Sequence, residues 1–162
     1  MIKNLDTNFL VKSAIVAALY AVLTLLLPMA SYGPIQLRFS EIMVLLVFYN
    51  KRFIPGLVLG CAIANLFSPM AAFDVVFGTL SSYVAFRLIL KSKTLFTASL
   101  WPVLMVIVPA LGTYFILAND AVLFIMILEF MASEFIMVSI IGVLIFKMLE
   151  KNDGFMNHIR EF

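Results

Sequence analysis

The stretch that decides the fold is QLRFSEIMVLLVFYNKR, residues 36–52. An apolar run lies between a charged pair near its start, Arg38 and Glu41, and a basic pair at its end, Lys51 and Arg52. Lys and Arg collect on the cytoplasmic side of membrane proteins, so the basic pair marks the inner end of a membrane-spanning helix. Arg38 and Glu41 then belong to the outer half, where charge is costly in lipid and points to function.

The rest of the chain repeats this charge pattern around further apolar runs. Of the eleven Lys and Arg residues, all but Arg38 fall where a six-pass protein has its cytoplasmic side. We therefore predict an all-α membrane protein, a bundle of six transmembrane helices with both termini cytoplasmic. The expected helices cover residues 9–27, 36–49, 53–67, 73–90, 95–117 and 121–149.

Composition agrees with a membrane protein made of one domain. Hydrophobic residues make up 64% of the chain and charged residues 12%, against roughly half and a quarter in soluble domains. A hydrocarbon core about 30 Å thick needs ~20 residues per helix, so residues 1–162 accommodate about six helices in a single domain. The net charge of +2 comes from the inner loops and indicates no nucleic-acid partner.

The segments between and beside the helices carry further expectations. The first apolar run follows Lys3 and Lys12, as in a signal peptide, but Asp6 and the later spans favour a retained first helix. We expect outer turns at Gly33-Pro34 and at Asn119-Asp120. Residues 151–162 are expected to form a short polar tail.

Small residues form ladders on two of the expected helices. In membranes, such ladders allow close approach of helix backbones. For the glycine ladder we favour packing inside the bundle, while the alanine ladders leave internal packing and docking of a partner equally open. The ladders are Ala14-xxx-Ala18 and Ala17-xxx-Ala21 on the first helix, and Gly56-xxx-Gly60-xxx-Ala64 on the third.

Polar side chains remain in the outer half after the inner cations are set aside. At ~1.5 Å of rise per helical residue, Glu41, Asp74 and Glu134 lie at comparable depths on three helices, so we expect them to face one another, a ligand or water. Their negative charge suits a cationic ligand or one rich in N–H donors, such as the edge of guanine. The candidate binding residues are Gln36, Arg38, Glu41, Asn65, Asp74 and Glu134.

Two structural alternatives accompany this binding site. Arg38 and Glu41 are three residues apart and can pair on one helix, so the polar set can also be a brace that holds the bundle together. For Asn65, a hydrogen bond to a neighbouring helix is as good an explanation as a ligand contact. Glu129 is left out of the site, because five residues place it ~140° around the helix from Glu134.

Catalytic and nucleotide-binding motifs are absent from the sequence. It has no G-x-x-x-x-G-K-[ST], H-E-x-x-H or G-x-S-x-G motif, and its single histidine, His158, lies near the C-terminus. We therefore expect no enzymatic activity, no metal and no cofactor. A binding subunit that takes its energy from partner proteins agrees best with this small chain.

Three blocks of sequence resemble the QueT family, the queuosine-precursor substrate-binding subunits (S-components) of energy-coupling factor (ECF) transporters. They are PIQLRFSE at 34–41, PGLVLGCAIANL at 55–66 and DVVFGTL at 74–80. The resemblance implies a six-helix bundle in the bacterial cell membrane that binds a compound such as 7-aminomethyl-7-deazaguanine from outside. It further implies docking, through Ala14 and Ala18, on a transmembrane T-component that two ATPase subunits drive.

Other functions remain open at this stage. Some relatives that carry the family name handle cobalamin, so another vitamin-like ligand is the first alternative. An autonomous secondary transporter and a purely structural membrane subunit are the other two.

Overall fold

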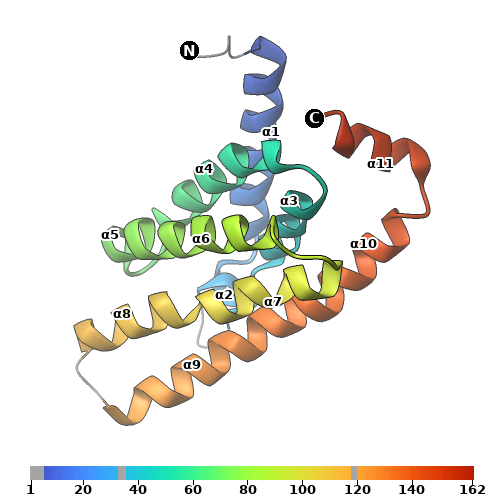
Figure 1. Ribbon diagram of the computed structural model, residues 1–162. Helices are drawn as coiled ribbons and strands as arrows, with labels where there is room; N and C mark the ends of the chain where they lie inside the picture. Colours follow the sequence, from blue (N-terminus) through green and yellow to red (C-terminus); the bar gives the residue numbers. More distant parts are fainter. Residues whose placement is uncertain (1–5, 33–35, 118–119) are drawn as a thin grey trace.

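The computed structural model describes residues 6–32, 36–117 and 120–162, with the side chains of 113–117 and 120–123 excepted. The turn expected at Gly33-Pro34 lies outside these residues, as does part of the one at Asn119-Asp120. Throughout the described part the regular structure is helical (Figure 1). The helices are α1 Thr7–Leu25, α2 Pro28–Ser31, η1 Phe39–Leu45, α3 Leu46–Tyr49, η2 Lys51–Phe53, α4 Ile54–Asn65, α5 Ala71–Phe73, η3 Asp74–Gly78, α6 Thr79–Ile89, α7 Leu95–Met105, α8 Ile107–Leu117, α9 Asp120–Glu134, η4 Phe135–Gly142, α10 Val143–Leu149 and α11 Asp153–Arg160.

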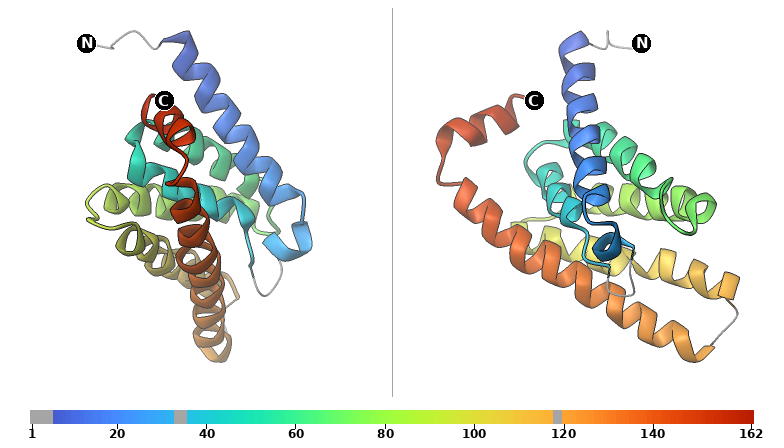
Figure 2. Two further views of the ribbon diagram at one scale, coloured as in Figure 1. Left: turned by 90° about the vertical axis from the view of Figure 1, so that its right-hand side faces the viewer. Right: turned by 180° about the vertical axis from the view of Figure 1, so that it is seen from behind.

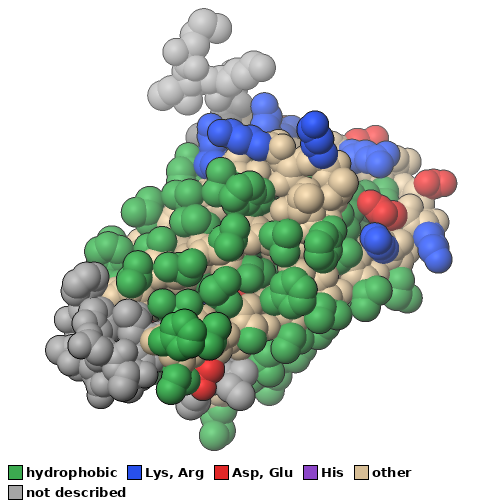
Figure 3. Space-filling view, turned by 60° about the horizontal axis from the view of Figure 1, so that its bottom comes forward, with side chains coloured by type: hydrophobic (Ala, Val, Ile, Leu, Met, Phe, Trp, Pro, Cys, Tyr) green, Lys and Arg blue, Asp and Glu red, His purple; other side chains and the backbone are tan. Residues whose placement is uncertain are grey.

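Among the described residues, four stretches of helix are long and apolar enough to cross a membrane, which confirms the prediction of a helical membrane bundle. They are Thr7–Leu25, Ala71–Ile89, Leu95–Gly112 and Phe124–Leu149. Phe39–Tyr49 is a shorter apolar helix, and α4 has 12 residues. In Figure 3, hydrophobic side chains cover the middle of the molecule, and Lys and Arg lie along one end.

Helices α1 and α4 pack closely against each other, and their contact depends on glycine. A Cβ added at Gly56 would lie 2.7 Å from the Ser13 carbonyl oxygen, and one at Gly60 would lie 2.8 Å from the Ala17 carbonyl oxygen. The predicted internal role of the glycine ladder is therefore confirmed. The two alanine ladders differ in burial. Ala17 and Ala21 are buried against the bundle, whereas Ala14 and Ala18 are exposed.

Proline interrupts the fifth expected helix and divides it into α7 and α8. Pro109 has no N–H, so it cannot donate to the carbonyl of Met105 four residues earlier. The hydroxyl of Ser81 on α6 donates to that carbonyl oxygen at 2.6 Å. A neighbouring helix thus satisfies the freed backbone group, as a membrane interior requires.

The C-terminal segment differs from the expected polar tail, because residues 153–160 form α11. Its buried residues Met156 and Ile159, with Phe162 beyond its end, lie three residues apart and so face one side of the helix. The rings of Phe162 and Phe53 are 4.1 Å apart, and Asn50 donates to the Ile159 carbonyl at 3.1 Å. The expectation was wrong because polar composition hid this short apolar stripe.

The start of α1 and the C-terminal helix α11 lie at the same end of the molecule. In Figures 1 and 2, the start of α1 and the end of α11 lie opposite the adjoining ends of α8 and α9. The contact of Lys12 with the Phe162 ring, 5.6 Å from the charged nitrogen to the ring centre, links the two directly.

Candidate functional site

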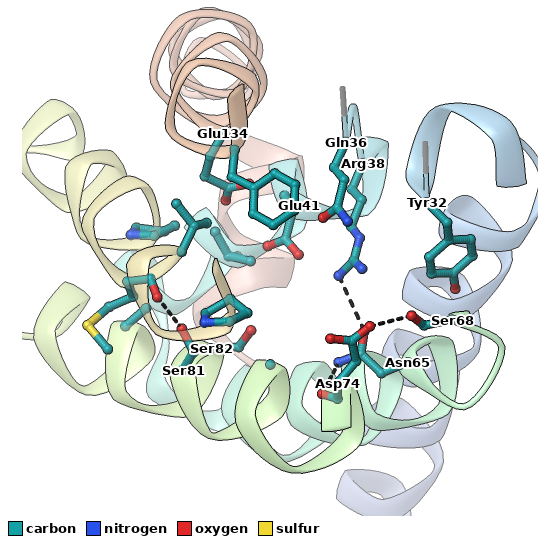
Figure 4. A pocket seen from close by; sticks show the side chains of 18 of the residues that line it. Tyr32, Gln36, Arg38, Glu41, Asn65, Ser68, Asp74, Ser81, Ser82 and Glu134 are labelled. Atoms are coloured by element: carbon teal, nitrogen blue, oxygen red, sulfur yellow. Dashed lines mark hydrogen bonds between the residues drawn. The ribbon is translucent and has the colours of Figure 1, made fainter. Parts of the chain in front are cut away.

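A cavity of about 500 Å³ lies within the bundle. It is bounded by the segment before η1, by η1, α4, η3 and α6, and by α7, α8 and α9. The sequence-predicted polar residues all line this one cavity, and Figure 4 shows how they surround it. They are Gln36, Arg38, Glu41, Asn65, Asp74 and Glu134.

Glu41 is held in place by a tyrosine of α1. Its side chain is only 7% exposed, and the hydroxyl of Tyr20, itself 1% exposed, donates a hydrogen bond to its Oε1. Beside it, the hydroxyls of Thr24 and Ser40 share a hydrogen bond of 2.7 Å, which ties α1 to the start of η1. Because Gly60 has no side chain, α4 leaves room for Tyr20 at this point.

Arg38 precedes η1, where the backbone is extended. Its Nε donates to the Ser31 carbonyl at 3.2 Å, and its Nη1 donates to Oδ1 of Asn65 at 3.3 Å. The guanidinium also lies over the Tyr32 ring, 5.4 Å from its centre. The expected direct pair with Glu41 assumed that both residues lie on one helix. Because Arg38 is outside the helix, its hydrogen bonds go to Ser31 and Asn65.

Asn65 joins three parts of the site. It is 1% exposed, and besides accepting from Arg38 it donates to the Asp74 carbonyl at 2.9 Å. Gly78 makes this possible, since an added Cβ there would lie 3.0 Å from the Asn65 amide nitrogen. The interhelical hydrogen bond considered from the sequence is therefore present, and Asn65 holds the Arg38 guanidinium in place.

Two further carboxylates face the cavity with acceptor capacity left. The hydroxyl of Ser68 donates to Oδ2 of Asp74 and itself accepts from the Met70 N–H at 3.2 Å. Oδ1 of Asp74 has no hydrogen bond to a described residue. Glu134, 7% exposed at the end of α9, likewise receives no hydrogen bond from the described part of the chain.

Both of these carboxylates lie at π-helical segments. Asp74 begins η3, and Glu134 immediately precedes η4. A π-helical turn locally shifts the side-chain register of an α-helix and occurs often at functional sites. In this protein the π-helical turns lie at Asp74 and Glu134, whose carboxylates have oxygen atoms free to accept hydrogen bonds from a ligand.

Glu129 also borders the cavity, although helical spacing excluded it. That exclusion was wrong because it treated the site as a point on one helix face, whereas the cavity extends along α9. The cavity-lining residues Ser81 and Ser82 were missed too. Ser81 follows Asp74 at a helical spacing of seven residues, which would have placed it on the same face.

The cavity has an excess of negative charge. Arg38 is the only Lys or Arg among its described lining residues, while Glu41, Asp74, Glu129 and Glu134 are acidic. Within the described ranges, no three His, Cys, Asp or Glu side chains are grouped as metal ligands. The arrangement can bind a ligand with several N–H donors and at least one acceptor for Arg38.

Asn65 and Glu134 are expected to differ in their effect on the stability of the empty protein. Asn65→Ala removes hydrogen bonds within the protein and leaves the buried Arg38 donor unpaired. The free energy of unfolding should therefore fall by about 1–3 kcal/mol, and the midpoint of thermal unfolding should fall by several degrees. Glu134→Gln removes no hydrogen bond and should leave the transition unchanged or raise it. Thermal unfolding of both purified variants without ligand checks this, and an equal loss would contradict it.

Comparisons with known proteins place the chain among membrane transporters. A family model described as QueT transporter matches residues 10–151. The queuosine precursor transporter QueT of Lactococcus lactis subsp. cremoris (strain MG1363) is 44% identical over 84 residues, which cover 51% of this chain and 49% of that protein. The match therefore spans about half the length of this curated relative. No solved structure matches the chain.

Proposed function

The chain belongs to the QueT transporter family, and from this premise we propose that it is a substrate-binding S-component of an ECF importer that binds a queuosine precursor. The observation that carries the proposal is a cavity in whose described wall one guanidinium and several carboxylates meet. The name of the Lactococcus relative supports the class of substrate. The chain acts as a carrier of this substrate and not as an enzyme.

Six transmembrane passes with both termini cytoplasmic follow from the same proposal. Two of the six passes, residues 36–49 and 51–65, contain short helices, but each becomes long enough to span most of the bilayer core when the residues next to the helix are included. With ~2.0 Å of rise per residue in η1 and ~1.5 Å in α3, residues 39–49 cover roughly 20 Å, and the extended residues 36–38 add about 10 Å. By the same rises, residues 51–65 cover roughly 24 Å. Both lengths approach the ~30 Å of a bilayer core.

Cysteine labelling tests this topology. In a Cys61→Ala background, a cysteine at Met29, which is 90% exposed, should react with a membrane-impermeant reagent in intact cells. A cysteine at Lys93, exposed in the turn between α6 and α7, should react only after permeabilisation. Labelling of position 93 from outside would refute the orientation.

The bound compound we propose is a 7-deazaguanine, with 7-aminomethyl-7-deazaguanine as the best candidate. Its carbonyl oxygen accepts from Arg38, which is already oriented by Ser31 and Asn65. Its N–H groups donate to the carboxylates, and Gln36 supplies a further amide at the cavity wall. Asn65 acts mainly through Arg38.

Replacing Arg38 by Lys should weaken deazaguanine binding at least about tenfold, because an ammonium cannot reproduce a planar guanidinium fork. Arg87→Lys, at an exposed position on α6 outside the cavity, is the matched control and should bind normally. Adenine-like compounds, which reverse donor and acceptor on the pairing edge, should bind poorly. Calorimetric titration of purified protein measures all of these.

Cobalamin belongs in the same titration as the alternative ligand. Tight binding of cobalamin without any response to the deazaguanine would refute the queuosine assignment and leave the S-component assignment standing.

The exposed alanines of α1 are the proposed docking surface for the T-component. Ala14 and Ala18 face outward, while Ala17 and Ala21 on the adjacent strip of the helix pack inside the bundle. An outward stripe of small residues lets another helix approach closely. ATP hydrolysis by two partner ATPases would then drive release of the substrate.

Ala14→Leu or Ala18→Leu should abolish ATP-dependent uptake and leave substrate binding by the isolated protein intact. Ala132→Leu, at an exposed position on the membrane-spanning α9, is the matched control and should transport normally. Ala17→Leu should impair both binding and uptake, since it lies between α1 and α4. Uptake and binding are measured in proteoliposomes with and without the partner subunits. ATP-independent uptake by this chain alone would overturn the S-component proposal.

A further inference from the structure

Glu41 and Glu134 present two buried carboxylates to the same cavity. They come from segments that pack against each other, η1 and the α9–η4 junction, and each is 7% exposed. Both residues line the cavity. Glu41 accepts one hydrogen bond from Tyr20, and Glu134 accepts none from the described residues. Two ionised carboxylates in such surroundings are costly unless a cation joins them or one of them takes up a proton.

The protein's own cation near this pair makes its hydrogen bonds to other residues. Arg38 is the only Lys or Arg among the described residues that line the cavity, and its Nε and Nη1 donate to Ser31 and Asn65. Figure 4 shows the guanidinium directed toward the Asn65 and Asp74 side, with Glu134 on the other side of Glu41. One guanidinium cannot balance two carboxylates, so a cationic group on the ligand is well suited to supply the second positive charge for Glu41 and Glu134.

We propose that Glu41 and Glu134 form a subsite for a primary ammonium group, and that this subsite selects the aminated form of the substrate. The inference rests on the proposed function and adds to it the part of the ligand that each carboxylate recognises. An ammonium has three N–H donors and a full charge, which suits two carboxylates with free oxygen lone pairs. Asp74, a single carboxylate, suffices for the uncharged N–H edge of the ring.

The order of groups in the ligand agrees with the order of side chains in the cavity. In 7-aminomethyl-7-deazaguanine the carbonyl oxygen lies between the ring N1–H and the aminomethyl arm. In the protein, Glu41 lies on one side of Arg38 (Figure 4), and on the other side Arg38 is hydrogen-bonded to Asn65, next to Asp74. With the carbonyl on Arg38, the ring edge meets Asp74 and the arm meets Glu41 and Glu134.

Three compounds of similar size test the ammonium end of the ligand independently of its ring edge, because they share the ring and differ only in the 7-substituent. They are 7-aminomethyl-7-deazaguanine, the uncharged 7-cyano-7-deazaguanine, and 7-deazaguanine without a substituent. The unmodified protein should bind the aminomethyl compound at least about tenfold more tightly than the other two, the factor expected for a buried charge-assisted contact. Glu134→Gln and Glu41→Gln should abolish this preference, and Asp74→Asn should weaken all three compounds alike.

Glu150→Gln is the matched control for net charge. Glu150 is exposed outside the cavity, where it accepts from Tyr49, so its loss should leave the preference for the amine intact. Thermal unfolding of each variant shows whether it is folded before it is titrated. Should a variant fail to fold, the ranking of the three compounds by the unmodified protein decides the question.

The outcomes distinguish this inference from the function on which it rests. If the three compounds bind equally well and Glu134→Gln changes nothing, the ammonium subsite is wrong while the deazaguanine function stands. If none of the three binds, the proposed function fails and the subsite with it. A preference that survives in Glu41→Gln and Glu134→Gln but is lost in Asp74→Asn would assign the ammonium to Asp74 and overturn the inference.

Discussion

The close contact of α1 with α4 is the constraint on which the rest of the site depends. Gly56 and Gly60 remove the side chains that would hold the two backbones apart. This approach places Tyr20 beside Glu41, to whose carboxylate its hydroxyl donates a hydrogen bond. The same approach turns Ala14 and Ala18 outward. One helix therefore holds a cavity residue in place through Tyr20 and also supplies the proposed docking stripe.

In a membrane interior, polar groups need partners within the protein, because lipid tails offer none. Among the described residues, the only fully enclosed side-chain nitrogen or oxygen without a hydrogen bond is the Ser13 hydroxyl. Thr24 with Ser40, Arg38 with Asn65, and Ser81 with Met105 show how this is achieved. Most buried polar groups are thus paired, whereas carboxylate oxygens of Glu134 and Asp74 at the cavity receive no hydrogen bond from the described residues. These free acceptors favour a ligand with several N–H donors.

Irregular helices position this cavity. The 3₁₀ segment η1 carries Glu41, the π-helical η3 begins at Asp74, and η4 follows Glu134. Pro109 adds the break between α7 and α8 on the opposite wall, with Ser81 satisfying the freed carbonyl. Irregular backbone is tolerated at membrane depth where it is buried in protein or lines a cavity. These irregular segments all border the same cavity, which agrees with a binding site there.

The sequence by itself determined the helical membrane class and the six polar residues that meet in the cavity, because charge is excluded from lipid and must turn inward wherever it occurs. It also singled out the glycine ladder, since small residues mark close helix contacts. Only the tertiary structure decided which acids already have partners, that Tyr20 supports Glu41, that Glu129 borders the same cavity, and that residues 153–160 form a docked helix. The physical reason is that hydrogen bonds and cavity walls arise between segments far apart in the chain, whereas hydropathy and small-residue spacing are local.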